Sequence, residues 1–437
     1  MTAPVSLNAT PTSSARQQPG RGLSWDILCR VVDNYGDAAV CWRLARALAH
    51  EQAGQVRLWI DQPQALQALQ GLPAAWADGW CYQGVNLHRL DAGGASLQGV
   101  TPAQVVVDAF GSGVPAAFEQ AMAQRQPASL VIVLDYLSAE SWVAQHHGLP
   151  SPHPQLSLRR YFFFPGFSAD SGGLLKEADY DARHAAFHAS AAPRQHFWRA
   201  VGFDLPSSDA RVMSLFGYEN PALTGLLQAL QETPSTVLAV PEGRCWPALA
   251  EWFGVSKLHA GHSLQRGGLQ LRCLPFLHQD DYDQLLWCCD WNLVRGEDSL
   301  VRALWAGKPL LWQLYPQAEA AHLPKLAAFL QRYLQPLSAG GANALQAEAA
   351  QSLRELALLW NGGEGGPGAA PQRWLQLLSH QAALSAHARN WSQALSAAAA
   401  SEGGLASRLA LFCAGKLEYR AFFVAGSFRD GTLIGEQ

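Results

Sequence analysis

Strand-like apolar runs alternate with helical runs in two separate series along this chain of 437 residues. The first series contains residues 25–32, 56–60, 103–110 and 129–137, and the second contains residues 211–218, 235–243, 269–277 and 291–294. Such alternation is typical of doubly wound α/β sheets with helices on both faces. The chain is too long for one hydrophobic core to organise. We therefore predict two Rossmann-like domains that face each other across a cleft.

The boundary between the two predicted domains lies near residue 205. Residues 23–205 are expected to form the first domain, and residues 206–399 the second. Residues 149–167 carry four prolines and are interpreted as a long irregular loop beside the first domain. Two further segments are defined by composition: residues 1–22 as a disordered extension and residues 361–370 as a flexible glycine-rich loop. Helices at about 400–437 are expected to pack back on the first domain.

Composition excludes several classes of protein. A net charge of −4 argues against a general nucleic-acid binder, and no apolar run approaches the roughly 18 residues that span a membrane. The eight cysteines are scattered without a CxxC pair, which disfavours a zinc site or a disulfide framework and favours a reducing cytoplasm. His184 and His188 have a spacing that suits a metal, and so do Asp281 and Asp283, but neither motif is complete, and no metal or cofactor is predicted.

The first candidate site is the turn between the strand-like run 25–32 and the helix that follows. Asp33 and Asp37 lie in this turn, and Val40, Leu44 and Leu48 mark one face of the helix. Ligands of open α/β sheets bind beyond the carboxyl ends of the strands, so an acidic turn there suggests a general base. The alternative is an ordinary helix cap at Asp37 or a local Asp-Asn turn.

The second candidate site is the turn 295–299, with the sequence RGEDS, which again joins a strand to a helix. A helix N-terminus presents free N–H groups that can hold a diphosphate, and Arg295 adds positive charge. Glu297 and Asp298 oppose such an anion, so one of them is better assigned to a ribose hydroxyl or to catalysis. The alternative is a capped surface helix in which Asp298 or Ser299 is the cap.

Aromatic side chains follow the strand-like runs of the second series. Phe216, Tyr218, Phe276 and Tyr282 lie in candidate loops, where a flat base could stack on them. Aromatic residues at strand ends also belong to hydrophobic cores, so their position alone does not distinguish the two roles.

Two long motifs, DNYGDAAVCWRLARAL and RGEDSLVRALWAGKPLLWQLYPQ, resemble those of the bacterial protein-arginine rhamnosyltransferases that modify translation elongation factor P. The resemblance runs from about Trp25 to near the C-terminus. It implies the glycosyltransferase B architecture and transfer of L-rhamnose from dTDP-β-L-rhamnose to an arginine, with inversion. The partners implied are the donor and the elongation factor in the cytoplasm, without nucleic acid or membrane.

The resemblance also implies roles for individual residues. Asp33, Asp37 and Glu297 are expected to be catalytic, with Asp37 the closest base candidate and Asp33 its electrostatic partner. The turn here reads GDAAV where the family more often has GDIGV, which changes a glycine at the helix start. The residues expected to bind the donor are Asn34, Tyr35, Gly36, Phe216, Tyr218, Phe276, Gln279, Tyr282, Arg295, Asp298 and Ser299.

Two other functions remain open at the level of the sequence. One is a glycosyltransferase B enzyme that uses another nucleotide sugar or a small acceptor. The other is a non-catalytic protein that binds a nucleotide sugar and docks on a translation factor.

Overall fold

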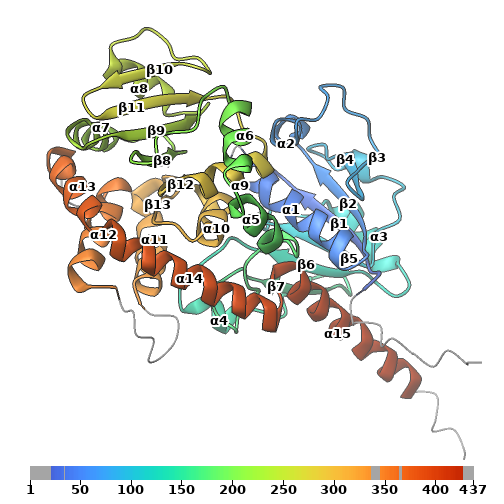
Figure 1. The fold of residues 1–437 in the computed structure, drawn as a ribbon. Coiled ribbons are helices and arrows are strands. Elements are labelled where there is room, and N and C mark those ends of the chain that lie inside the picture. The colour runs from blue at the N-terminus through green and yellow to red at the C-terminus, as the bar shows by residue number, and fades with distance from the viewer. Residues whose placement is uncertain (1–20, 34, 336–344, 364–366, 427–437) are drawn as a thin grey trace, which may run out of the picture.

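The computed structural model describes residues 21–33, 35–335, 345–363 and 367–426. These residues form two α/β domains that lie side by side (Figure 1). The predicted pair of doubly wound domains is confirmed, and it has the glycosyltransferase B architecture. Residue 34 and most of the extension 1–22 lie outside the described residues, and so does the centre of the glycine-rich loop.

The first domain is built on a seven-stranded sheet in the order β3-β4-β2-β1-β5-β6-β7, in which every strand but β3 is parallel to its neighbours. Its helices include α1 (Gly36–Glu51), α2 (Pro63–Gln70), α3 (Ala116–Gln124) and α4 (Trp142–His146). The strands are β1 (Ser24–Cys29), β2 (Gln55–Ile60), β3 (Trp80–Tyr82), β4 (Val85–Arg89), β5 (Val105–Ala109), β6 (Leu130–Leu134) and β7 (Arg159–Phe163).

The second domain repeats this topology with six strands in the order β10-β11-β9-β8-β12-β13. Only β10 is antiparallel. The strands are β8 (Arg211–Leu215), β9 (Thr236–Pro241), β10 (Ser263–Arg266), β11 (Leu269–Leu274), β12 (Trp291–Arg295) and β13 (Leu310–Gln313). The helices include α7 (Leu223–Glu232), α8 (Trp246–Phe253), α9 (Gln279–Cys288), α10 (Gly296–Ala306), α11 (His322–Tyr333), α12 (Ala347–Trp360) and α13 (Ala370–Ser379).

Both sheets place their first strand in the interior. Strand β1 lies between β2 and β5, and β8 lies between β9 and β12. At such a switch point the connections leave in opposite directions, and a crevice opens beyond the carboxyl ends of the strands. The loops after β1, β8 and β12 therefore meet at the cleft between the domains.

The interpretation of residues 149–167 as irregular was wrong in part. Residues 159–163 form β7, an edge strand parallel to β6. The prolines that indicated a loop, Pro150, Pro152, Pro154 and Pro165, all lie outside this strand. Proline disrupts a strand only where it removes a ladder hydrogen bond, so the run RRYFF between them remains free to pair.

The chain reaches the second core earlier than residue 205. Helices α5 (Tyr180–His188) and α6 (Ala192–Ala200) bury Tyr180, Phe187, Phe197 and Trp198 in the same hydrophobic cluster as the second sheet. Their sequence contains no strand-like run, so alternation alone could not assign them to a domain.

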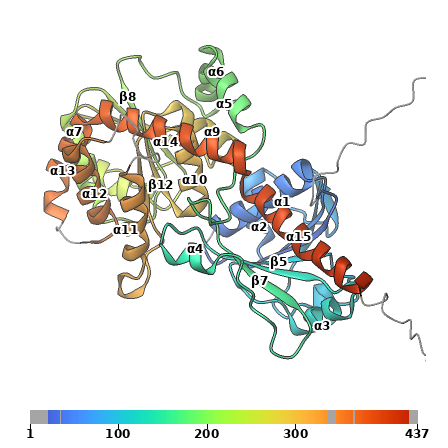
Figure 2. The same cartoon turned by 90° about the horizontal axis from the view of Figure 1, so that it is seen from below.

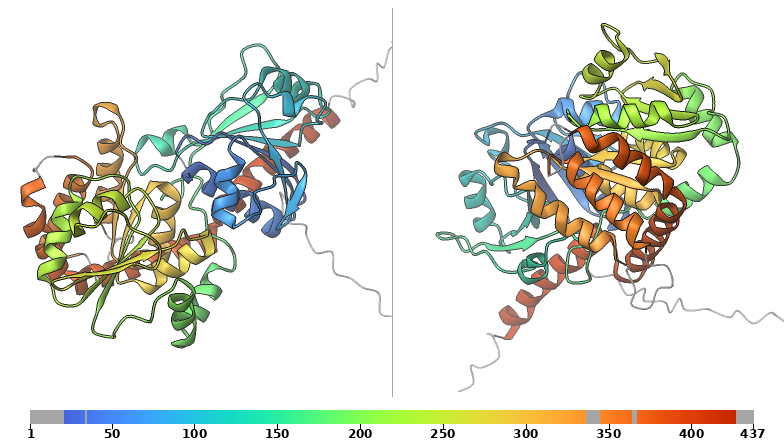
Figure 3. Two further views of the ribbon diagram at one scale, coloured as in Figure 1. Left: turned by 90° about the horizontal axis from the view of Figure 1, so that it is seen from above. Right: turned by 90° about the vertical axis from the view of Figure 1, so that its left-hand side faces the viewer.

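The last two helices lead the chain from the second domain back to the first. Helix α14 (Gln381–Glu402) packs on the second core through Leu384, Trp391 and Leu395. Helix α15 (Leu405–Gly426) then runs along the first domain (Figures 2 and 3), where Leu409 and Cys413 are buried in its core. None of the helices in the described part of the chain is long and apolar enough to cross a membrane.

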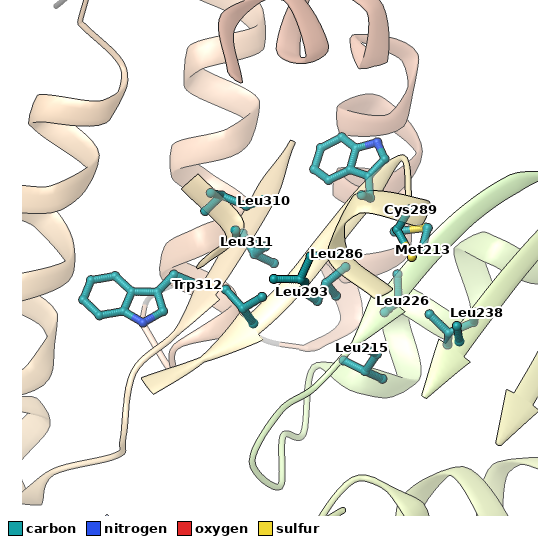
Figure 4. Packing of buried hydrophobic residues seen from close by; sticks show 14 of the residues in the cluster. Met213, Leu215, Leu226, Leu238, Leu286, Cys289, Leu293, Leu310, Leu311 and Trp312 are labelled. Carbon is teal, nitrogen blue, oxygen red and sulfur yellow. The ribbon is translucent and has the colours of Figure 1, made fainter. Parts of the chain in front are cut away.

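The core of the second domain is continuous from its sheet to the helices on both faces. Figure 4 shows Met213 of β8, Leu238 of β9 and Leu226 of α7 gathered together, and all three are fully buried. Each buried aliphatic side chain stabilises the fold by roughly 1.5–3 kcal/mol, so this packing holds β8 and β12 in place. The strand ends at the cleft are thus held by the core beneath them.

A buried cluster of charged side chains joins the two domains. The guanidinium of Arg43, on α1 of the first domain, is fully buried. It lies 2.7 Å from Glu177, 3.2 Å from Asp283 on α9 and 3.0 Å from Asp298 on α10. Arg302 binds the same Asp283 and Glu177, each at 2.6 Å. The cluster fixes α1 against α9 and α10.

We expect Arg43→Met to destabilise the fold by about 3–5 kcal/mol, because it leaves the carboxylate of Asp298 without its ion-pair partner and removes one of the two buried cations that Glu177 and Asp283 share. Chemical denaturation followed by tryptophan fluorescence measures the effect. Arg183→Met is the matched control, since Arg183 pairs with carboxylates of the same cluster at 3.8–3.9 Å but is 30% exposed. Its loss should cost under about 1 kcal/mol. Equal effects of the two substitutions would contradict a buried clamp.

Candidate active site

The turn after β1 is closed by Asp37. The Oδ2 atom of Asp37 accepts hydrogen bonds from the backbone N–H groups of Val32 (2.7 Å) and Asp33 (2.9 Å). The N-cap position belongs to Tyr35 and carries no side-chain cap bond. The alternative of a simple helix cap at Asp37 is therefore wrong, because its carboxylate binds the loop that precedes the helix. Asn34, predicted to bind the donor, lies outside the described residues.

Asp37 is almost completely buried. Burial raises the pKa of its carboxyl group, although the bonds from Asp33 and Val32 act in the opposite direction. A carboxylate with a raised pKa is a stronger base than one in water. Its Oδ2 atom is held by the two amides, and a hydrogen bond from the side chain of Tyr136 also lowers its pKa.

Asp33 reaches across the cleft to the second domain. Its Oδ2 accepts a hydrogen bond of 2.7 Å from the hydroxyl of Tyr218. Two glycines make room for this carboxylate. A Cβ atom would lie 2.9 Å from Oδ2 at Gly36, and 3.3 Å from Oδ2 at Gly296, where φ is also +62°. The two turns approach each other so closely that these positions accept no larger side chain without a shift.

The turn after β12 leads into α10 without a side-chain cap. Asp298 binds Arg43 at 3.0 Å, and the hydroxyl of Ser299 donates to the carbonyl of Arg295. The alternative of a surface helix capped by Asp298 or Ser299 is therefore wrong. The first N–H groups of α10 remain available at the cleft, where a helix N-terminus favours an anion.

Glu297 ties the second domain to the first. Its Oε2 accepts a hydrogen bond of 2.7 Å from the backbone N–H of Leu137, and its Oε1 pairs with Lys325 of α11. Burial raises the pKa of Glu297, Lys325 lowers it, and the nearby Asp37 raises it. Both oxygens of Glu297 thus already have partners. This carboxylate therefore holds Leu137 and Lys325 in place as well as lining a cavity.

One cavity collects most of the residues that the sequence singled out. It lies between α1 and the strand ends of the second domain, and of the predicted site residues that the structure describes only Asp37 is absent from its walls. Those that line it are Asp33, Tyr35, Gly36, Phe216, Tyr218, Phe276, Gln279, Tyr282, Arg295, Glu297, Asp298 and Ser299.

Aromatic rings form one side of this first cavity. The ring centroids of Tyr35 and Phe276 lie 5.2 Å apart. The guanidinium of Arg295 lies 4.3 Å from the ring of Phe216 and 4.7 Å from that of Tyr218. Phe216 and Phe276 are half-buried and offer ring surface to a ligand, whereas Tyr218 and Tyr282 are buried.

Arg295 provides the positive charge of the first cavity. Its side chain is buried, and the described part of the chain offers it no carboxylate within ion-pairing distance. A buried guanidinium held between rings, beside the start of α10, suits a phosphate or diphosphate.

A second cavity adjoins the first. Asp33, Gly36, Gly296 and Glu297 line both, so they form the wall between them. Asp37 lines only the second. Its other walls come from both domains and include Val32, Val40, Phe110, Tyr136, Trp312, Tyr315, His322 and Lys325. The two candidate turns therefore separate a cavity that contains Arg295 from one that contains Asp37.

Sequence reasoning missed Phe110, Tyr136 and Lys325. Phe110 follows β5 directly and Tyr136 lies two residues after β6, but both were included in the strand-like runs 103–110 and 129–137. Lys325 lies inside α11, a helix without a distinguishing motif. Of Asp281 and Asp283, whose spacing suits a metal, Asp283 is an ion-pair partner of Arg43 and Arg302 in the buried cluster.

The chain matches the family model for the elongation-factor P (EF-P) rhamnosyltransferase EarP over residues 25–414. It is 47% identical over 347 residues to the protein-arginine rhamnosyltransferase of Pseudomonas aeruginosa, covering 79% of this chain and 89% of that protein. The corresponding protein of Pseudomonas putida is 44% identical over 370 residues, covering 84% and 93%.

A solved structure shows the same likeness in three dimensions. It comes from work on the structural basis of EarP-mediated arginine glycosylation of translation elongation factor EF-P. The TM-score is 0.61 at 33% identity, and the match covers 91% of this chain and 99% of that one. With two facing Rossmann-like domains and paired turns at the cleft, the chain therefore belongs to the EarP family of rhamnosyltransferases.

Proposed function

We propose that this enzyme transfers L-rhamnose from dTDP-β-L-rhamnose to an arginine side chain of translation elongation factor P, with inversion at the anomeric carbon. The observation that carries the proposal is the pair of cavities with a common wall at Asp33, Gly36, Gly296 and Glu297. A single displacement needs donor and acceptor on opposite sides of the reacting carbon. Two adjoining cavities of different chemistry suit this requirement.

The first cavity is assigned to the donor. Phe216 and Phe276 offer half-buried rings to the thymine base. The start of α10 and Arg295 meet the diphosphate, whose negative charge grows as the bond to the sugar breaks. Asp298 and Gln279 border this cavity but are engaged with Arg43 and Gln70, so we assign them to holding its shape rather than to direct recognition.

The second cavity is assigned to the acceptor. A guanidinium stays protonated near neutral pH and is a poor nucleophile, so it must be oriented and must lose a proton as it reacts. Asp33 and Asp37 supply negative charge on the side that faces the sugar. During transfer the C1–O bond to the diphosphate breaks and dTDP leaves with the bonding electrons. A C1–N bond forms, and the proton from that nitrogen passes to Asp37.

Asp37 is the preferred base for two reasons. Burial raises the pKa of its carboxyl group, and the backbone bonds to Oδ2 fix its orientation. Asp33 is bound to Tyr218 and serves to hold the two turns together and to attract the cation. We also propose a cytoplasmic location, which the eight cysteines without a disulfide support, since a reducing compartment keeps thiols free.

The first test mixes enzyme, elongation factor P and dTDP-rhamnose and measures the mass of the elongation factor. Wild-type enzyme should add one deoxyhexose. Asp37→Asn should lower kcat by roughly 100- to 10,000-fold, as expected for loss of a general base. Its affinity for dTDP, measured by calorimetry, should hardly change, because Asp37 does not line the first cavity.

Asp61→Asn is the matched control for this test. Asp61 also binds a backbone amide of the same turn, that of Val31 at 2.9 Å, but it lines neither cavity. It should retain most of the activity. Wild-type enzyme that adds no sugar, or full activity in Asp37→Asn, would refute the proposal. Transfer from UDP- or GDP-sugars in preference to dTDP-rhamnose would refute the assignment of the donor.

A second prediction concerns pH. Burial raises the pKa of Glu297 and Lys325 opposes this rise, so Lys325→Met should raise that pKa further. As the pH falls, Glu297 then becomes protonated at a higher pH than in the wild type. We expect the acidic limb of the kcat/KM profile to move to higher pH in Lys325→Met and to stay in place in Lys325→Arg. An unmoved limb in both would show that ionisation of Glu297 does not limit the reaction.

A further inference from the structure

The second cavity contains an aromatic pair that has no role in the reaction described above. Phe110 follows β5 and Tyr136 follows β6, and the parallel strands bring both to the cleft. Their ring centroids lie 4.5 Å apart with an interplanar angle of 18°, which is a stacked arrangement. Both side chains are half-buried, so ring surface remains exposed to the cavity.

The backbone at Phe110 is held in an unusual conformation. Its φ angle is +60°, in the left-handed region that bulky side chains rarely adopt, and its N–H donates to the carbonyl of Leu134 at 2.6 Å. Such conformations persist where the surrounding structure imposes them, and they concentrate at ligand sites. At this position the conformation places the ring of Phe110 against Tyr136.

The surroundings of this pair are rich in carboxylates. Burial raises the pKa of the Tyr136 hydroxyl, and so do the charges of Asp37, Glu297, Asp33 and Asp135. In turn, a hydrogen bond from Tyr136 lowers the pKa of Asp37. The one cation found near the ring in the described chain is Lys325, whose Nζ lies 5.6 Å from the ring centroid and pairs with Glu297.

We propose that Phe110 and Tyr136 form the wall against which the acceptor guanidinium lies, and that the Tyr136 hydroxyl orients the carboxylate of Asp37 toward one guanidinium nitrogen. This inference rests on the proposed function and assigns acceptor recognition within it. A planar guanidinium stacks on aromatic rings while its edge binds carboxylates. A lysine ammonium cannot fill a flat slot in the same way, so the wall selects arginine over lysine.

Two substitutions separate the ring from the hydroxyl. Tyr136→Leu removes both and should raise the acceptor KM roughly five- to tenfold, the size of a partly buried cation–π contact. Tyr136→Phe keeps the ring, so it should leave the acceptor KM close to that of the wild type and lower kcat roughly tenfold. Neither should alter the affinity for dTDP, because Tyr136 does not line the first cavity.

Phe110→Leu should raise the acceptor KM as Tyr136→Leu does. Phe162→Leu is the matched control, because Phe162 forms a stacked pair with Phe164, at 5.9 Å and 21°, and lines neither cavity. It should change neither constant. All variants are assayed with purified elongation factor P and dTDP-rhamnose.

The outcomes distinguish this inference from the proposed function. Wild-type enzyme that transfers no rhamnose would refute the proposed function itself. Wild-type enzyme that transfers rhamnose, with unchanged acceptor KM in both Tyr136→Leu and Phe110→Leu, would refute only the aromatic wall. An equal rise in Phe162→Leu would also refute it, since the effect would then follow from a general loss of aromatic packing. A reduced dTDP affinity in Tyr136→Phe would refute the assignment of Tyr136 to the acceptor side.

Discussion

The buried ion cluster around Arg43 is the interaction on which the geometry of the site depends. Arg43 lies on α1, the helix that begins beside Asp37, and it binds Asp298 on α10, the helix that begins beside Glu297. The two turns belong to different domains and are about 260 residues apart in sequence. Charges removed from water are costly unless they are paired and hydrogen-bonded. The cluster therefore favours one relative position of α1 and α10, with the turns in contact.

That position creates a wall rather than a single open cleft. The bond between Asp33 and Tyr218, the small residues Gly36 and Gly296, and the bond from Leu137 to Glu297 bring the domains together along one line. On one side lie Arg295 and the rings of Phe216 and Phe276, and on the other lie Asp37 and the rings of Phe110 and Tyr136. A glycosyl transfer needs donor and acceptor on opposite sides of the reacting carbon, and the wall provides two such sides. Residues that contact no substrate thus contribute by keeping the two sides apart.

Local signals explain what the sequence could predict. The turns at 33–37 and 295–299 were found because a strand, polar residues and a helix follow one another directly. The roles of Asp37 and Asp298 within them were not visible, because each depends on a partner: backbone amides in one case and Arg43 in the other. Strand β7 was hidden by flanking prolines. Lys325 and the pair of Phe110 and Tyr136 reach the site only through tertiary packing, which no spacing in the sequence records.

A crystal structure with dTDP and an arginine-containing peptide of the elongation factor tests the central claim most directly. We expect the nucleotide in the first cavity, with its diphosphate at the start of α10 beside Arg295. The arginine side chain should lie in the second cavity, with a nitrogen nearest to Asp37 and the wall at Asp33 and Glu297 between the two ligands. A nucleotide in the second cavity, or an arginine that reaches the sugar without contacting Asp37, would contradict it.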